Sequence, residues 1–152
     1  MEIALAGNPN VGKSALFSRL TGVGVISSNY PGTTVEFFEG QAKFMGSTIT
    51  VIDLPGTYSL AGNTDDERVA TNLLFERRPG TVIAVLDTTR LERNLVLLFE
   101  LIESGYHVVA SLNMFDVMRK SGRDVDVARL ERILMIPAIP TVATKGEGID
   151  SL

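Results

Sequence analysis

Apolar and polar positions form short blocks along the first third of the chain. Ile3–Ala6 is an apolar run typical of a buried strand, and Ala15–Leu20 is typical of a helix that follows it. Val35–Phe44 and Ser47–Leu54 are predicted to pair as antiparallel strands, because the residues near Met45-Gly46 suit a tight turn between them.

The rest of the chain alternates strand and helix patterns. Thr81–Leu86 is a continuous apolar run typical of a buried parallel strand. One helical face carries five apolar residues: Leu91, Leu95, Leu98, Phe99 and Ile102. Further helices are predicted at Asp65–Arg77 and Val127–Leu134, and further strands at Val108–Leu112 and Ile136–Pro140. This alternation predicts an α/β fold: a mostly parallel, six-stranded sheet with one antiparallel edge strand and helices on both faces.

Composition indicates one globular domain over residues 1–152. The chain has 45% hydrophobic residues, enough for a sizeable core, and no cysteine, which excludes disulfides and thiolate metal sites. A net charge of −4 argues against a nucleic-acid partner. No apolar run has membrane-spanning length, so the isolated domain is expected to be soluble. Gly148–Leu152 is expected to begin a closing helix that is cut short, leaving an open apolar strip that favours self-association.

A phosphate-binding loop is the strongest chemical signal. The pattern G-x-x-x-x-G-K-[ST] is matched between the first strand and the first helix by Gly7, Asn8, Pro9, Asn10, Val11, Gly12, Lys13 and Ser14, with Ala15 next. The glycines and the helix N-terminus present N–H groups to an anion. Lys13 is expected to reach the β and γ phosphates and Ser14 to ligate Mg²⁺.

Two further segments are expected to sense the last phosphate. Asp53 ends an apolar strand and is expected to hold Mg²⁺ through water, while the Gly56 amide approaches the γ-phosphate. Between this strand and the phosphate loop lie Gly32, Thr33 and Thr34, and a threonine there is expected to close over Mg²⁺ and the γ-phosphate.

Two segments near the C-terminus predict a guanine base. Asp116 is expected to accept hydrogen bonds from the guanine ring N–H and exocyclic amine, and Asn113 to tie its loop to the phosphate loop. Met114 replaces the lysine usual in the N-K-x-D pattern and is expected to cover the base face. A backbone N–H among Val142, Ala143 and Thr144 is expected to meet guanine O6. Together the motifs predict a Ras-like G domain.

The order and wording of these motifs resemble the cytoplasmic G domain of the FeoB-type ferrous iron transporters. The resemblance covers the whole chain; its more specific parts are Tyr58-Ser59-Leu60, Leu91–Leu95 and the Asn113-Met114-Phe115-Asp116 word. It implies that a membrane region lies in the same polypeptide or complex. It also implies that this domain lies at the cytoplasmic face of the inner membrane. It also implies that Thr34, rather than Thr33, is the metal-binding threonine. One departure is Ser28-Asn29-Tyr30, where the family usually has Gly-Asn-Trp.

The expected activity is slow hydrolysis of GTP to GDP and phosphate, with Asn10, Lys13, Thr34 and Gly56 as the catalytic set. Thr57 stands where Ras-type enzymes carry a water-orienting glutamine, and it is too short for that role. The resemblance implies that K⁺ assists instead, held partly by Asn10; alternatively, Asn10 only braces the loop. Two other classes stay open: a soluble ribosome-assembly or RNA-modifying GTPase, and a nucleotide-sensing module whose hydrolysis is incidental.

Several charged residues are expected to be structural. Asp65, Asp66 and Glu67 suit the first turn of a helix. Arg90 and Arg93 are expected on a solvated face away from the phosphate loop, and Arg119-Lys120 as solvated loop charges.

Overall fold

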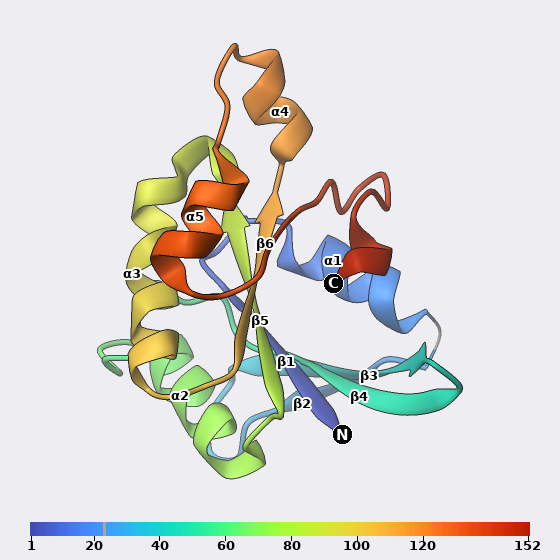
Figure 1. The fold of residues 1–152 in the computed structure, drawn as a ribbon. Helices are drawn as coiled ribbons and strands as arrows, with labels where there is room; N and C mark the ends of the chain where they lie inside the picture. Colours follow the sequence, from blue (N-terminus) through green and yellow to red (C-terminus); the bar gives the residue numbers. More distant parts are fainter. Residues whose placement is uncertain (23) are drawn as a thin grey trace.

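A computed structural model of the protein describes residues 1–22 and 24–152, and its core is a single sheet (Figure 1). The strands are β1 (Glu2–Gly7), β2 (Ile26–Asn29), β3 (Glu36–Phe44), β4 (Ser47–Asp53), β5 (Thr81–Asp87), β6 (Val108–Asn113) and β7 (Ala138–Pro140). The helices are α1 (Lys13–Thr21), α2 (Asp65–Arg77), α3 (Leu91–Glu103), α4 (Phe115–Lys120) and α5 (Val127–Leu134). Two short 3₁₀ helices, η1 (Thr88–Arg90) and η2 (Ile149–Ser151), complete the described elements.

The sheet has seven strands in the order β2-β3-β4-β1-β5-β6-β7, one more than the sequence predicts. Five neighbouring strands run parallel to one another, in the order β4, β1, β5, β6 and β7. Strand β3 is antiparallel to both of its neighbours, β2 and β4. The antiparallel strand is therefore not the edge, because β2 pairs outside it. Only Ile26 is a large apolar residue among the four residues of β2, and its side chain is exposed, so this strand has no hydrophobic signature.

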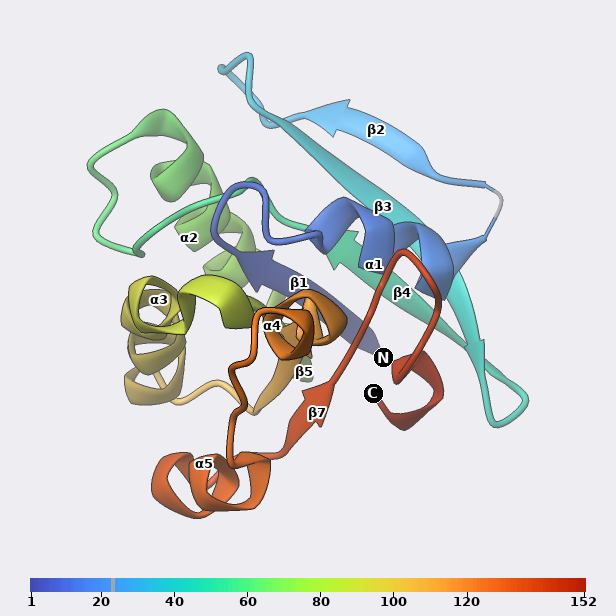
Figure 2. The same cartoon turned by 90° about the horizontal axis from the view of Figure 1, so that it is seen from above.

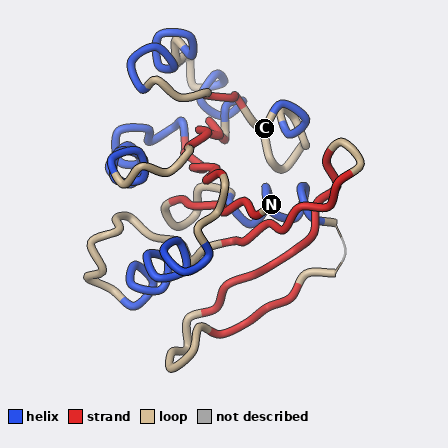
Figure 3. The backbone as a smooth tube through the Cα atoms, turned by 60° about the horizontal axis from the view of Figure 1, so that its bottom comes forward, coloured by secondary structure: helices blue, strands red, loops and turns tan. Residues whose placement is uncertain are grey.

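Helices cover both faces of the sheet, as expected (Figures 1 and 2). On one face, α2, α3 and α5 bury a core that includes Leu74, Leu98 and Leu134. On the other face, α1 and η2 pack over a smaller core around Leu16 and Val85. The tube in Figure 3 shows that strands β2, β3 and β4 extend away from the centre of the sheet, which helices cover on both faces.

Most predicted helices are confirmed. The bounds of α2 and α5 match the prediction, and α1 begins two residues earlier than Ala15. Helix α4 was not expected: Arg119 and Lys120 lie in its last turn rather than in a loop, and Arg119 stacks 4.7 Å from the centre of the Phe115 ring. The expected first turn of a closing helix is the 3₁₀ helix η2.

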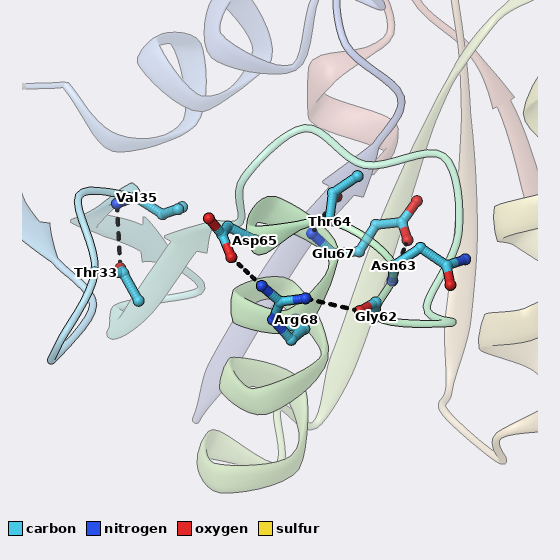
Figure 4. A network of polar contacts seen from close by, with 8 residues as sticks. All are labelled: Thr33, Val35, Gly62, Asn63, Thr64, Asp65, Glu67 and Arg68. Carbon is cyan, nitrogen blue, oxygen red and sulfur yellow. Dashed lines mark hydrogen bonds and ion pairs between the residues drawn. The ribbon is translucent and has the colours of Figure 1, made fainter.

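The start of α2 explains the acidic run (Figure 4). The Thr64 hydroxyl accepts a hydrogen bond from the Glu67 N–H at 3.2 Å, and the Glu67 carboxylate accepts one from the Asn63 N–H at 2.9 Å. This arrangement resembles a capping box, except that the Glu67 carboxylate holds the N–H of the residue before the N-cap, Thr64. Arg68 pairs with Asp65 one turn along. Asp65, Asp66 and Glu67 all lie in the first turn of α2, as expected. No group of three or more His, Cys, Asp or Glu side chains among the described residues is arranged to hold a metal.

Within the part of the chain that the structure describes, no helix combines the length and apolar character needed to cross a membrane.

Candidate functional site

The motif residues gather where parallel strands end. The phosphate loop follows β1, Asp53 ends β4, Asn113 ends β6, and Thr141–Thr144 follows β7. Because these strands are parallel, their carboxyl ends lie along one edge of the sheet, where open α/β sheets bind ligands. The fold therefore brings segments more than 100 residues apart in sequence to one site.

The phosphate loop turns sharply between β1 and α1. Asn10 and Gly12 both have positive φ, 65° and 88°, which a glycine adopts without strain. At Gly12 the neighbour also matters, since a Cβ atom there would lie 2.2 Å from Asn113 Nδ2. The sequence therefore needs a glycine at this point for both reasons.

A cavity of about 650 Å³ lies over this loop. Its lining comprises Asn8, Pro9, Asn10, Gly12, Lys13, Ser14, Ala15, Val35, Glu36, Pro55, Gly56, Asp66 and Met114. The predicted phosphate loop thus supplies most of the wall. Val35, Glu36, Pro55 and Asp66 are not predicted as site residues; the first three lie beside or within a motif, whereas Asp66 comes from the first turn of α2.

Lys13 and Asp53 form an ion pair at the floor of the site. Lys13 also donates to the Leu54 carbonyl. Burial raises the pKa of the Asp53 carboxyl, and the charge and hydrogen bond of Lys13 act in the opposite direction. The pair joins the phosphate loop to the end of β4; Lys13 lines the cavity, whereas Asp53 is buried and is not among the lining residues.

Gly56 lies against the phosphate loop. A Cβ at this position would be 3.2 Å from the Pro9 Cα, closer than an ordinary contact. The next residue, Thr57, is 2% exposed; its N–H donates to the Gly7 carbonyl at 3.1 Å and its hydroxyl donates to the Ser59 carbonyl at 2.8 Å. Its side chain is therefore turned inward and used in the backbone turn.

The segment with the two candidate threonines is the turn between β2 and β3. The Thr33 hydroxyl donates to the Tyr30 carbonyl at 3.0 Å and accepts from the Val35 N–H at 3.1 Å (Figure 4). Thr34 is exposed, and with Gly32 and Thr33 it lies outside the residues that line the cavity. Tyr30 links this turn to α2, because its hydroxyl hydrogen-bonds the Glu76 carboxylate at 2.6 Å, which raises the pKa of Tyr30.

Asn113 connects three loops. Its Nδ2 donates to the Val11 carbonyl at 2.8 Å, which is the expected tie to the phosphate loop. Its Oδ1 accepts from the Ala143 N–H at 3.0 Å, and the buried Thr88 hydroxyl donates to its carbonyl at 2.7 Å. The sequence gives no sign of Thr88, since one threonine after a strand has no distinctive pattern.

Asp116 lies at the start of α4, beside a smaller hollow of about 240 Å³ that Val142 also lines. Lys145 Nζ donates to its Oδ2 at 2.8 Å, and this hydrogen bond lowers the pKa of the Asp116 carboxyl below its ordinary value. Met114, with a φ of 57°, directly precedes α4 and lines the larger cavity. Arg19 holds the adjoining turn by donating to the carbonyls of Ala143 and Thr144.

The start of α3 is next to the phosphate loop at Arg93, which corrects the expectation that this residue lies away from it, while Arg90 and Arg93 are both exposed, as expected for a solvated face. Asn8 Nδ2 donates to the Arg93 carbonyl at 3.3 Å, and the Arg93 guanidinium lies 4.5 Å from the centre of the Tyr58 ring. Asn8 Oδ1 is buried and has no hydrogen-bond partner among the described residues. Because Asn8 lines the cavity, this oxygen is available to a bound ligand or its water.

Comparison with known proteins identifies relatives over the whole chain. The sequence model of the family described as "Ferrous iron transport protein B" matches residues 1–152. The chain is 44% identical over 153 residues to an Fe(2+) transport protein A/Fe(2+) transporter FeoB fusion protein of Porphyromonas gingivalis. That alignment covers 100% of this chain and 18% of the relative, so the chain spans about a fifth of the length of the curated relatives it matches.

Solved structures agree. The FeoB G-domain of Methanococcus jannaschii superposes with a TM-score of 0.87 and 40% identity, covering 99% of this chain and 90% of that one. The cytosolic domain of T. maritima FeoB in a GMPPNP form gives a TM-score of 0.95 and 40% identity, covering 99% of this chain and 60% of that one.

Proposed function

The chain belongs to the ferrous iron transport protein B family and has the fold of its G domain, and from this premise we propose that it binds GTP and hydrolyses it to GDP and phosphate. In this role it is the nucleotide switch of a ferrous iron transporter. One observation carries the proposal: the cavity over the phosphate loop is bordered by Lys13, Gly56 and Met114, which come from three separate motifs.

The nucleotide is assigned to this edge by chemistry. The N–H groups of the loop from Gly7 to Ala15 and the ammonium of Lys13 suit the phosphates. Asp116, held ionised by Lys145, suits the donor edge of guanine, and the turn of Val142, Ala143 and Thr144 lies beside it. The family match favours this assignment over a ribosome-assembly or RNA-modifying GTPase.

The residues present also fit Mg²⁺. Ser14 lines the cavity, and the buried carboxylate of Asp53 lies beside Lys13. Ser14, Thr34 and, through water, Asp53 would hold the ion, which neutralises charge on the β and γ phosphates when it is bound. Thr34 lies outside the cavity lining, so its part requires the β2–β3 turn to move towards the phosphates.

K⁺ assistance is the remaining part of the proposal. Thr57 is tied into its own turn and offers no group to orient water. Asn10 is exposed and lines the cavity, and its side-chain carbonyl is a hard oxygen donor suited to an alkali cation. These two features favour slow hydrolysis that a monovalent cation accelerates.

The rest of the transporter is proposed from the relatives. Since the chain matches about a fifth of their length, we assign the iron-conducting membrane region to another part of the same polypeptide or complex. The domain would work at the cytoplasmic face of the inner membrane, with no nucleic-acid partner.

Nucleotide titration and turnover test the function. We expect the purified chain to bind GDP and GTP in preference to ADP and ATP and to release phosphate slowly from GTP when Mg²⁺ is present. Lys13→Ala should abolish turnover, while Lys120→Ala, an exposed lysine of α4, should not. Equal affinity for adenine and guanine nucleotides, or no hydrolysis by the wild type, would refute the proposal.

A further inference from the structure

Helix α3 holds the segment that follows Gly56. The Glu100 carboxylate accepts two hydrogen bonds from this segment: its Oε1 from the Ser59 hydroxyl at 2.8 Å, and its Oε2 from the Leu60 N–H at 2.6 Å. Both oxygens of one acid are therefore used on consecutive residues. Bonds to an ionised carboxylate are short and about twice as strong as neutral ones.

The same helix is also attached to the phosphate loop. Near its start, the Arg93 carbonyl accepts from Asn8, while its guanidinium stacks on Tyr58. Helix α3 thus touches the phosphate loop at one point and the segment of Tyr58, Ser59 and Leu60 at several others. Helix α3 therefore fixes the position of the phosphate loop relative to the segment of Tyr58, Ser59 and Leu60.

Gly56 lies between these attachments. On one side it packs tightly on Pro9, where an added Cβ would lie 3.2 Å from the Pro9 Cα, and on the other Thr57 donates to the Gly7 carbonyl. Beyond Thr57, the chain is restrained by the Tyr58 ring against Arg93 and by the Glu100 bonds on Ser59 and Leu60. The position of the Gly56 N–H at the cavity edge therefore depends on them.

We infer that Glu100 is a positioning residue for GTP hydrolysis: by holding Ser59 and Leu60 it keeps the Gly56 N–H where a γ-phosphate binds. The inference rests on the proposed function. It predicts different effects on GTP and GDP binding, because GDP has no γ-phosphate and does not make the contact with the Gly56 N–H.

The test compares Glu100→Ala, Glu100→Gln and a control, Glu103→Ala, which removes an exposed acid from the same helix. We expect Glu100→Ala to lower kcat and GMPPNP affinity by about tenfold, since small misplacements at a reacting centre have effects of this order or larger. GDP affinity should stay within about twofold of wild type. A twofold change is clearly distinguishable from the expected tenfold loss, which corresponds to about 1.4 kcal/mol. The glutamine should restore most of the loss, since its amide can still accept from Leu60 and donate to Ser59.

Two results would overturn the inference. One is equal loss of GDP and GMPPNP affinity in Glu100→Ala, which indicates a general structural role; the other is wild-type kcat and GMPPNP affinity. If Glu100→Ala does not fold, Ser59→Ala removes one of the two bonds and should give the same split between nucleotides on a smaller scale. Failure of the proposed function looks different, because the wild type itself would then bind no GDP.

Discussion

At the scale of single residues, the proposed preference for guanine rests on Asp116. Asp116→Asn should weaken GDP binding by about a hundredfold or more and favour xanthine nucleotides, because the amide presents a donor where guanine needs an acceptor. Competition between GDP and XDP measures this, with Asp124→Asn, an exposed acid beyond α4, as control. Since Lys145 holds the pKa of Asp116 low, wild-type affinity should not fall as the pH is lowered to the ordinary carboxyl range. Unchanged GDP affinity in the asparagine variant would disprove the role.

The two threonines of the β2–β3 turn have different surroundings. The Thr33 hydroxyl forms both of its hydrogen bonds within the turn itself, whereas Thr34 is exposed. Thr34→Ala should therefore lower kcat by about a hundredfold, the scale of losing a direct transition-state contact, and spare GDP binding. Thr33→Ala is the matched control in the same turn. The larger kinetic loss falling on Thr33→Ala would show that the register of this segment is shifted by one residue.

Asn10 provides a test of the cation. Turnover should be faster in KCl than in NaCl by about tenfold or more, because a cation beside the phosphates offsets developing charge as an arginine finger does. Asn10→Ala should remove this difference while leaving GDP affinity in place. A variant that loses GDP binding instead would support the alternative that Asn10 braces the loop.

At the scale of elements, the end of β6 connects the phosphate loop to the loop after β7 through Asn113. Asn113 is 4% exposed and satisfies the Val11 carbonyl and the Ala143 N–H, so Asn113→Ala leaves two buried groups without partners. We expect the free energy of unfolding to fall by about 2 to 4 kcal/mol. Urea denaturation measures it, and Asn63→Ala, at an exposed position, should change it little. A similar small change in both variants would mean that water replaces the lost bonds.

Elements with a strong pattern were predictable from the sequence, and those made by tertiary context were not. Thr81–Leu86 is apolar throughout because β5 lies between two parallel strands, and the acids at the start of α2 occupy its first turn, where they suit the helix dipole. Strand β2 has no such signal, since only pairing with β3 makes it a strand. Helix α4 is six residues long and begins at Phe115, directly after Met114, whose left-handed φ no sequence pattern marks.

The site divides in the same way. Contiguous motifs such as the phosphate loop were found from spacing, and the tie from Asn113 was expected. Contacts between distant elements were not, because no local pattern encodes them: Glu100 on Ser59 and Leu60, Arg93 beside Asn8, and Lys145 on Asp116. Lys145 directly follows the Val142–Thr144 motif, and this adjacency is the one sequence signal that pointed towards it.

For the whole molecule, the two faces of the sheet are covered unequally. Helices α2, α3 and α5 close one core, whereas on the other face α1 and η2 leave a groove of about 470 Å³. Apolar side chains line much of it: Ile3, Leu20, Ala42, Phe44, Ile49, Ile83, Val109 and Leu152. Grooves of this character favour association, because burying apolar surface stabilises a complex by about 25 cal/mol per Å² before the costs of binding.

We therefore expect this chain to self-associate through the groove. Sedimentation over a range of concentrations should show a reversible shift from monomer to a larger species. Leu20→Lys places a charge in the groove and should restore the monomer, whereas Ile133→Lys changes an apolar residue of α5 that is 66% exposed and lies on the other face. Because both variants add one charge, repulsion alone cannot distinguish them, and only loss of the groove contact can. A strictly monomeric wild type at high concentration would contradict the prediction, as would equal dissociation by the two lysine variants.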